Sequence, residues 1–187
     1  MESIEEVLLD SDDKMSKSTT FLLDQFNGIR TGKASPALVE NIEVPYYGTP
    51  TRLREIAGIA TPEPRLIVIN AFDPSALGDI EKAILAANLG VTPLNDGRVV
   101  RVPIPELSEE RRKEMTKLAK RMAEEGRVAI RNIRRETNDQ VKSLQKGGKA
   151  TEDERDEALK DIQKATDDYI KQIDDAMKAK EAEIMEV

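Results

Sequence analysis

Four arginines occur at spacings that place them on one flank of a helix. Arg127, Arg131, Arg134 and Arg135 stand at i, i+4, i+7 and i+8. Like charges at such spacings destabilise their own helix by a few tenths of a kcal/mol per pair, so the row needs another explanation. The guanidinium group is a planar fork that suits phosphate oxygens. The row therefore predicts a phosphate-binding surface, and it extends backward through Lys113, Lys117, Lys120 and Arg121.

The charge distribution supports a local basic surface on an acidic chain. Residues 111–135 hold ten basic and three acidic side chains, whereas the whole chain has a net charge of −7. Because aromatic residues make up only 3% of the sequence, a nucleic acid bound here would be recognised more by its backbone shape than by its bases. Two simpler interpretations stay open: a solvated helix face, or neutralisation of the row by acid-rich neighbouring helices.

Catalytic and metal-binding patterns are weak. The chain has no His and no Cys, which removes the commonest general base and the commonest metal ligands. Gly32-Lys33-Ala34 departs from a phosphate loop, because Ala34 stands where Ser or Thr is needed and a helix precedes it. Asp10-Ser11-Asp12-Asp13 lacks the glycine and the terminal Glu of a calcium loop. Adjacent carboxylates such as Glu109 and Glu110 diverge on a helix. We therefore expect a protein that is not an enzyme and uses no cofactor or metal.

Three long amphipathic helices are predicted. The first runs from about Ser3 to Ile29, with Ser3 and Glu6 as a capping box. The second runs from Ser108 to about Gln145, and the third begins at Thr151 with a second capping box. Their apolar stripes are Ile4, Leu8, Ser11, Met15, Ser18, Leu22, Phe26 and Ile29; Met115, Leu118, Met122, Gly126, Ala129, Ile133, Thr137, Val141 and Leu144; and Ala158, Ile162, Ala165, Tyr169, Ile173, Ala176 and Ile184.

The segment between the first two helices has a different pattern. Alternation over residues 42–46 and the runs 56–60, 66–71 and 99–102 predict strands. Pro45 indicates an edge position or a bulge. Asn95-Asp96-Gly97 predicts a turn. Asp73 is expected to cap a helix that ends at Gly90 and buries Ala76, Ile80, Ala83, Ile84 and Ala87.

These elements predict an α+β fold in two parts. Residues 1–30 and 105–187 are expected to form an antiparallel three-helix bundle, since the short link at 145–150 forces the last two helices antiparallel. Residues 31–104 are expected to form a small β/α/β domain inserted between the first two helices. No apolar run approaches the ~18 residues of a membrane span, so we expect a cytoplasmic protein without a membrane partner.

With those residues in view, the sequence resembles the bacterial ribosome recycling factors over nearly its whole length. The segments that carry the resemblance are 29–36 (IRTGKASP), 46–50 (YYGTP), 79–84 (DIEKAI), 88–90 (NLG), 101–105 (RVPIP), 109–113 (EERRK) and 128–135 (VAIRNIRR). Together they are far more specific than any single short motif. Only the first few residues and the Gly147-Gly148 loop depart from the family pattern.

The resemblance implies an L-shaped monomer of transfer-RNA-like dimensions, with the two domains joined by a two-strand hinge. It implies binding between the ribosomal subunits after termination, with the bundle against large-subunit ribosomal RNA. Elongation factor G and GTP would then drive subunit splitting and release of the ribosome from mRNA. The implied ribosome-binding residues are Arg134, Arg131, Arg127, Arg135, Arg30, Lys117, Lys120 and Arg111. The implied hinge residues are Thr31, Gly32, Lys33 and Ala34 with Val102, Pro103, Ile104 and Pro105.

Two rival functions from other classes remain. A helical scaffold could pair its stripes with a partner coiled coil and direct its arginines at acidic protein, which predicts oligomers that depend on concentration. A peripheral membrane adaptor could place the basic row on anionic lipid, which predicts vesicle binding. The acidic total of the chain argues against the second.

Overall fold

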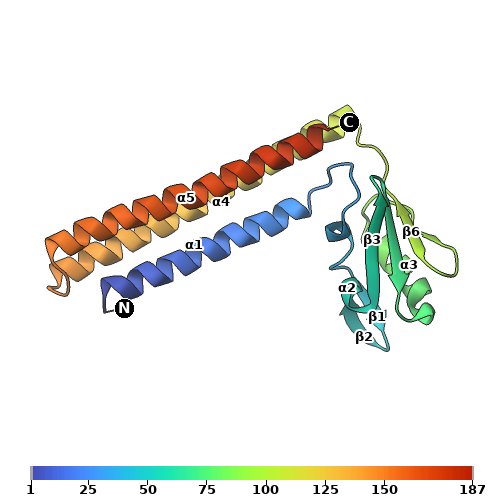
Figure 1. The fold of residues 1–187 in the computed structure, drawn as a ribbon, viewed down its shortest axis with the longest axis horizontal. Helices are drawn as coiled ribbons and strands as arrows, with labels where there is room; N and C mark the ends of the chain where they lie inside the picture. Colours follow the sequence, from blue (N-terminus) through green and yellow to red (C-terminus); the bar gives the residue numbers. More distant parts are fainter. Residues whose placement is uncertain (1, 187) are drawn as a thin grey trace. The chain divides into compact units, whose positions relative to one another are not determined.

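A computed structural model describes residues 2–186 and divides the chain into two compact units. One unit combines the chain up to Ile29 with the chain from Lys113 onward, and the other comprises Arg30–Arg112. The first is helical and the second carries both sheets (Figure 1). The α+β fold class, with a β/α segment inserted into a helical unit, is confirmed.

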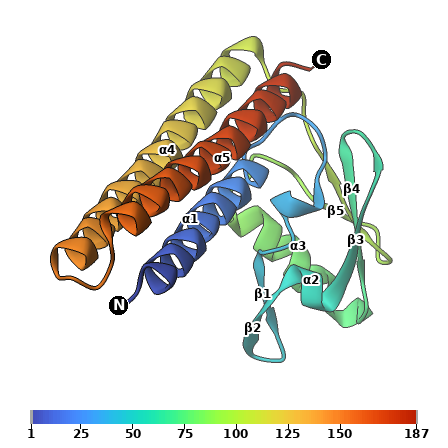
Figure 2. The ribbon, with the colours of Figure 1, turned by 60° about the vertical axis from the view of Figure 1, so that its left-hand side comes forward.

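In the helical unit, the helices α1 (Ile4–Asn27), α4 (Glu109–Lys146) and α5 (Glu152–Met185) lie side by side (Figure 2). The pair Arg127–Asp174 and the pair Lys120–Glu181 show that α4 and α5 run antiparallel. The Asp12–Tyr169 hydrogen bond and the Glu2–Lys149 ion pair show that α1 runs parallel to α5.

The helix starts follow their capping residues. Thr151 and Glu154 form a complete capping box at α5, as predicted. At α1, the hydroxyl of Ser3 accepts the N–H of Glu6, also as predicted. The second half of that box differs from the prediction, because the carboxylate of Glu6 accepts the N–H of Glu2 instead of that of Ser3.

The core of the helical unit consists of two apolar clusters with a layer of hydroxyl groups between them. The larger cluster includes Met15, Ile130 and Ile173, and the smaller includes Val7 and Val141. The buried hydroxyl residues Ser11, Thr137 and Thr166 lie between these positions on α1, α4 and α5. Both threonines donate to the carbonyl four residues earlier in their own helices, which satisfies their hydroxyls.

The last part of α4 follows the predicted stripe, with Thr137, Val141 and Leu144 buried, but in the earlier part the buried line is displaced. Ala119, Ala123 and Ile130 are fully buried, while Met115, Met122 and Ile133 pack at the edges of the cluster. Gly126 explains the close packing on this side, because a Cβ there would lie 2.6 Å from Leu22 Cδ2 of α1. Small side chains therefore face α1 and α5 along the first half of α4.

The β/α unit contains a hairpin and a four-stranded antiparallel sheet. The hairpin turns at Tyr47 and Gly48, which both have positive φ, the geometry of a type I′ turn. The sheet order is β3-β4-β6-β5, so the most apolar predicted strand, β4, lies at its centre. The bounds are β1 Glu43–Tyr46, β2 Thr49–Arg52, α2 Leu53–Ile56, β3 Ala57–Glu63, β4 Leu66–Ala71, α3 Leu77–Ala86, β5 Leu94–Asn95 and β6 Val100–Pro103, with short 3-10 turns at Pro36–Leu38 and Pro74–Ala76.

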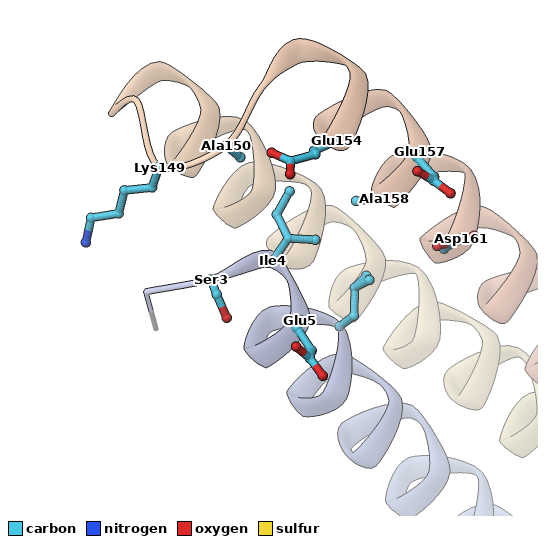
Figure 3. Close-up of a pocket in the computed structure, with 10 residues that line it drawn as sticks. Ser3, Ile4, Glu5, Lys149, Ala150, Glu154, Glu157, Ala158 and Asp161 are labelled. Carbon is cyan, nitrogen blue, oxygen red and sulfur yellow. The ribbon is translucent and has the colours of Figure 1, made fainter.

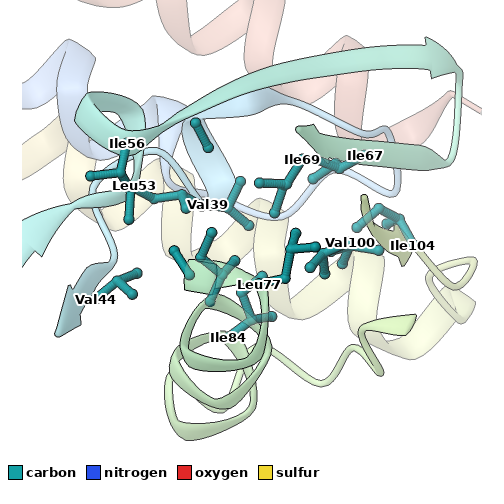
Figure 4. Close-up of a cluster of buried hydrophobic side chains, with 14 residues drawn as sticks. Val39, Val44, Leu53, Ile56, Ile67, Ile69, Leu77, Ile84, Val100 and Ile104 are labelled. Carbon is teal, nitrogen blue, oxygen red and sulfur yellow. The ribbon is translucent and has the colours of Figure 1, made fainter. Parts of the chain in front are cut away.

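The core of this unit is apolar throughout and packs α3 against the sheet (Figure 4). Ile67, Ile69, Ile80 and Ile84 are fully buried. Ala87 was predicted to be buried and is exposed, because α3 ends at Ala86. At the other end of the helix, Leu77 was not predicted to be buried and is buried.

Other local predictions in this unit differ in detail. Asp73 caps a 3-10 turn, accepting from the backbone and side chain of Ser75, before α3 begins at Leu77. The predicted turn at Asn95-Asp96-Gly97 is confirmed, with both acceptor side chains bonded to backbone N–H groups. Pro45 lies in the two-stranded hairpin, where every strand has an open edge, as its sequence position indicated.

Candidate nucleic-acid interface

Six of the eight predicted basic residues form one flank of α4, and Ser108 accepts a backbone hydrogen bond at the start of this helix. On a helix with 3.6 residues per turn, the cations share less than about a third of the circumference. We call this set the basic flank: Lys117, Lys120, Arg127, Arg131, Arg134 and Arg135. The flank borders α5, and its members differ in what they meet there.

Arg127 is occupied by carboxylates within the protein. Its Nε donates to Asp174 Oδ1 at 2.7 Å, and Nη1 donates to Glu124 Oε2 at 3.1 Å. Burial lowers the pKa of Arg127, but its hydrogen bonds to the two carboxylates outweigh this and raise it overall. Only 22% of its side chain is exposed, so Arg127 contributes to the contact between α4 and α5.

Arg131 and Lys120 are each partly neutralised. Nη1 of Arg131 donates to Glu124 Oε1 at 3.2 Å, and Nζ of Lys120 lies 3.9 Å from Glu181 Oε1. Hydrogen bonds from Arg127 and Arg131 lower the pKa of Glu124, which keeps it ionised. Arg131 and Lys120 remain solvent-accessible, with 38% and 63% of their side chains exposed, respectively.

Arg134, Arg135 and Lys117 have no carboxylate partner among the described residues. Nη1 of Arg134 donates to Gln163 Oε1 at 3.5 Å, and Nη1 of Arg135 donates to Asn132 Oδ1 at 3.5 Å. Both are long contacts with neutral amides, so each guanidinium keeps most of its five donors for an external acceptor. These three residues form the open part of the basic flank.

The other two predicted binding residues lie elsewhere. Arg111 lies in the first turn of α4, in the short part of that helix that belongs to the β/α unit. Arg30 belongs to the β/α unit, where its Nη1 donates to the carbonyl of Leu89 at 3.4 Å. Its guanidinium lies over the turn after α3, 3.2 Å from where a Cβ on Gly90 would stand.

The predicted hinge residues are tied to the β/α unit more than the sequence indicated. Val102 and Pro103 belong to β6 and pair with Ile67 and Leu66. The N–H of Ala34 donates to the carbonyl of Pro64 at 2.7 Å. Ile104 is buried, and its N–H donates to the carbonyl of Arg65, also at 2.7 Å. Thr31, Gly32 and Pro105 form none of these backbone contacts.

A hollow of about 340 Å³, where α1 and α5 begin, has the opposite charge (Figure 3). Ile4 and Leu8 line it, and its charged lining residues are Glu5, Glu154, Glu157 and Asp161 with one cation, Lys149. A phosphate would be repelled there, so the hollow is not part of the candidate interface.

The described residues include no cluster of three acidic side chains suited to a metal ion. Within residues 2–186, no helix has both the length and the apolar character needed to cross a bilayer.

Comparison with known proteins decides the family. The family model described as ribosome recycling factor matches residues 22–185. The ribosome-recycling factor of Alkaliphilus metalliredigens is 52% identical over 125 residues, covering 67% of this chain and 68% of that protein. That of Leptospira biflexa is 53% identical over 133 residues, covering 71% and 73%. The chain belongs to the ribosome recycling factor family.

Solved structures agree with this assignment. The solution structure of a ribosome recycling factor matches all of this chain and all of its own, with 39% identity and a TM-score of 0.83. The T. thermophilus ribosome recycling factor has been placed, with E. coli elongation factor G, on the E. coli post-termination complex. It matches 98% of this chain and 100% of its own, with 42% identity and a TM-score of 0.72. The family takes its name from a role in translation, not from a chemical reaction.

One residue beside the open part of the flank was not predicted from the recycling-factor motifs. Gln163 of α5 contacts Arg134 across 29 positions of sequence. A signal was present, since the acidic residues 167, 174 and 181 recur every seven positions on α5, as Lys120, Arg127 and Arg134 do on α4. Matching these two repeats in antiparallel register would have directed attention to this part of α5.

Proposed function

We propose that this ribosome recycling factor binds the ribosome after termination through phosphates of large-subunit ribosomal RNA. The open part of the basic flank supports this, because Arg134, Arg135 and Lys117 lack carboxylate partners among the described residues. Cations held in that way are available to phosphate oxygens, whereas Arg127, which would contribute less, must share its donors with Asp174 and Glu124. Arg131 and Lys120 would add to the field of the flank, and Arg30 and Arg111 would contribute outside it.

We further propose that the bound protein acts with elongation factor G and GTP to split the subunits and free the ribosome from mRNA. The T. thermophilus relative supports this, since it has been placed with elongation factor G on a post-termination complex. In this proposal a monomer works in the cytoplasm, with residues 1–30 and 105–187 held on RNA while 31–104 receives force. Flexion would occur at Thr31, Gly32 and Pro105, which form none of the hinge's backbone contacts with the β/α unit.

Co-sedimentation of the full chain with vacant ribosomes over a salt series tests the interface. If about five phosphates are contacted, affinity should fall roughly a hundred-fold between about 50 and 200 mM salt. Arg134→Ala should weaken binding by about 1–3 kcal/mol, because one charge-assisted contact is lost, and should leave helicity intact. Lys17→Ala is the matched control, since it removes a cation of α1 that is paired with Asp13.

Two results would contradict the proposal. If Arg134→Ala pelleted with ribosomes like the unmodified protein, the assignment of the interface would be wrong. If Lys17→Ala weakened binding as much as Arg134→Ala, net charge would explain the binding and the open part of the flank would have no special role.

A further inference from the structure

The contact between α4 and α5 carries a repeating set of charge pairs. Lys120 meets Glu181, and Arg127 meets Asp174. From the first pair to the second, the position moves seven residues forward on α4 and seven residues backward on α5. This is the register of an antiparallel coiled coil. We call this line of pairs the α4–α5 seam.

The next position of the seam breaks the pattern. Seven residues after Arg127 is Arg134, and seven residues before Asp174 is Asp167. The register therefore offers Asp167 to Arg134 in the same way that Asp174 is offered to Arg127. The hydrogen bonds run otherwise, because Nε2 of Gln163 donates to Asp167 Oδ1 at 2.9 Å and Arg134 donates to Gln163 Oε1.

The amide of Gln163 suits both neighbours. Its NH₂ group satisfies the carboxylate of Asp167, and its oxygen faces the guanidinium of Arg134. Gln163 and Asp167 are four residues apart on α5, the spacing at which side chains on a helix meet. A neutral group thus stands between a cation and an anion that the helix register would otherwise pair.

We propose that Gln163 is a positioning residue that keeps Arg134 available for RNA by engaging Asp167. This inference rests on the proposed function, because it needs Arg134 to bind phosphate. Without the amide, Asp167 is freed and pairs with Arg134 as Asp174 pairs with Arg127. RNA would then compete with an internal carboxylate for that guanidinium.

The test measures binding of vacant ribosomes by four variants over the same salt series. Gln163→Ala should weaken binding about three- to tenfold. The negative slope of log affinity against log salt should become shallower by about one, since one phosphate contact is lost. Gln163→Glu should weaken binding at least as much, since it places a carboxylate directly against Arg134. Asp167→Asn should bind within about twofold of the unmodified protein. Gln163→Ala/Asp167→Asn should bind like Asp167→Asn, because the competing carboxylate is absent.

Gln172→Ala is the matched control, since Gln172 is an exposed glutamine of the same helix. Circular dichroism and urea unfolding of every variant show whether the bundle is intact. A loss of binding caused by misfolding would not be relieved by Asp167→Asn, so relief separates a positioning role from a structural one.

The outcomes distinguish this inference from the proposed function. If Arg134→Ala binds normally, the proposed interface is wrong and the role of Gln163 falls with it. If Arg134→Ala weakens binding while Gln163→Ala does not, the interface stands and the role of Gln163 is overturned. If Gln163→Ala weakens binding and Asp167→Asn gives no relief, Gln163 does not act through Asp167, and the inference is again overturned.

Discussion

Arg127 and Arg134 lie one heptad apart on the same flank of α4, yet they meet different groups on α5. Arg127 reaches a carboxylate at 2.7 Å and is further held by Glu124. Arg134 reaches the amide of Gln163 at 3.5 Å, while Asp167, the acidic residue at the equivalent position of the α4–α5 seam, accepts a hydrogen bond from Gln163. The same residue type at equivalent positions therefore serves helix packing in one place and stays available for a ligand in the other. The surroundings, not the residue, decide the role.

The largest effect expected from this comparison is on stability. Arg127→Ala should lower the free energy of unfolding by about 1 kcal/mol, because it removes a partly buried ion pair and leaves Asp174 and Glu124 without it. Arg134→Ala should change it by less than about 0.5 kcal/mol, since no carboxylate depends on it. Urea unfolding followed by helical circular dichroism measures both. Equal losses in the two variants would show that the two positions do not differ.

A smaller effect is expected on binding when Arg127 is released. Asp174→Asn removes the carboxylate that forms the shortest hydrogen bond with Arg127. Ribosome affinity should therefore rise about two- to fivefold, and its salt dependence should steepen. Asp175→Asn is the matched control, since it removes the same charge from the adjacent position on α5. An equal gain from Asp175→Asn would mean that general repulsion by acids, rather than the pair with Arg127, limits binding.

The smallest effect concerns pH. Hydrogen bonds from Arg127 and Arg131 place the pKa of Glu124 below its ordinary value of 4.5. A lowered folded-state pKa gives stability that is present above pH 4.5 and lost as pH falls through the folded-state value. Between pH 6 and pH 3 the unmodified protein should therefore lose slightly more stability than Glu124→Gln. Urea unfolding at a series of pH values measures this, and identical pH profiles would contradict the assigned role of Glu124.

The two units differ in how far their sequences predicted them. The long helices follow from apolar residues at three- and four-residue spacing and from caps such as Thr151 with Glu154, because these signals lie within one turn of chain. In the β/α unit, β2 was not predicted. Its sequence Thr-Pro-Thr-Arg has no apolar alternation, and it pairs with β1 through the left-handed turn at Tyr47-Gly48. The two-residue strand β5 likewise exists only as a partner of β6.

The sequence by itself determined where the basic flank lies, since helical periodicity places residues on a common side whatever they pack against. It also determined the family, through motifs spread over most of the chain. Only the tertiary structure decided which cations are open. Asp174 and Gln163 come from another helix, 47 and 29 positions away from the arginines they meet. Hydrogen bonds depend on distance in space and on direction, so no pattern along α4 alone could separate Arg127 from Arg134.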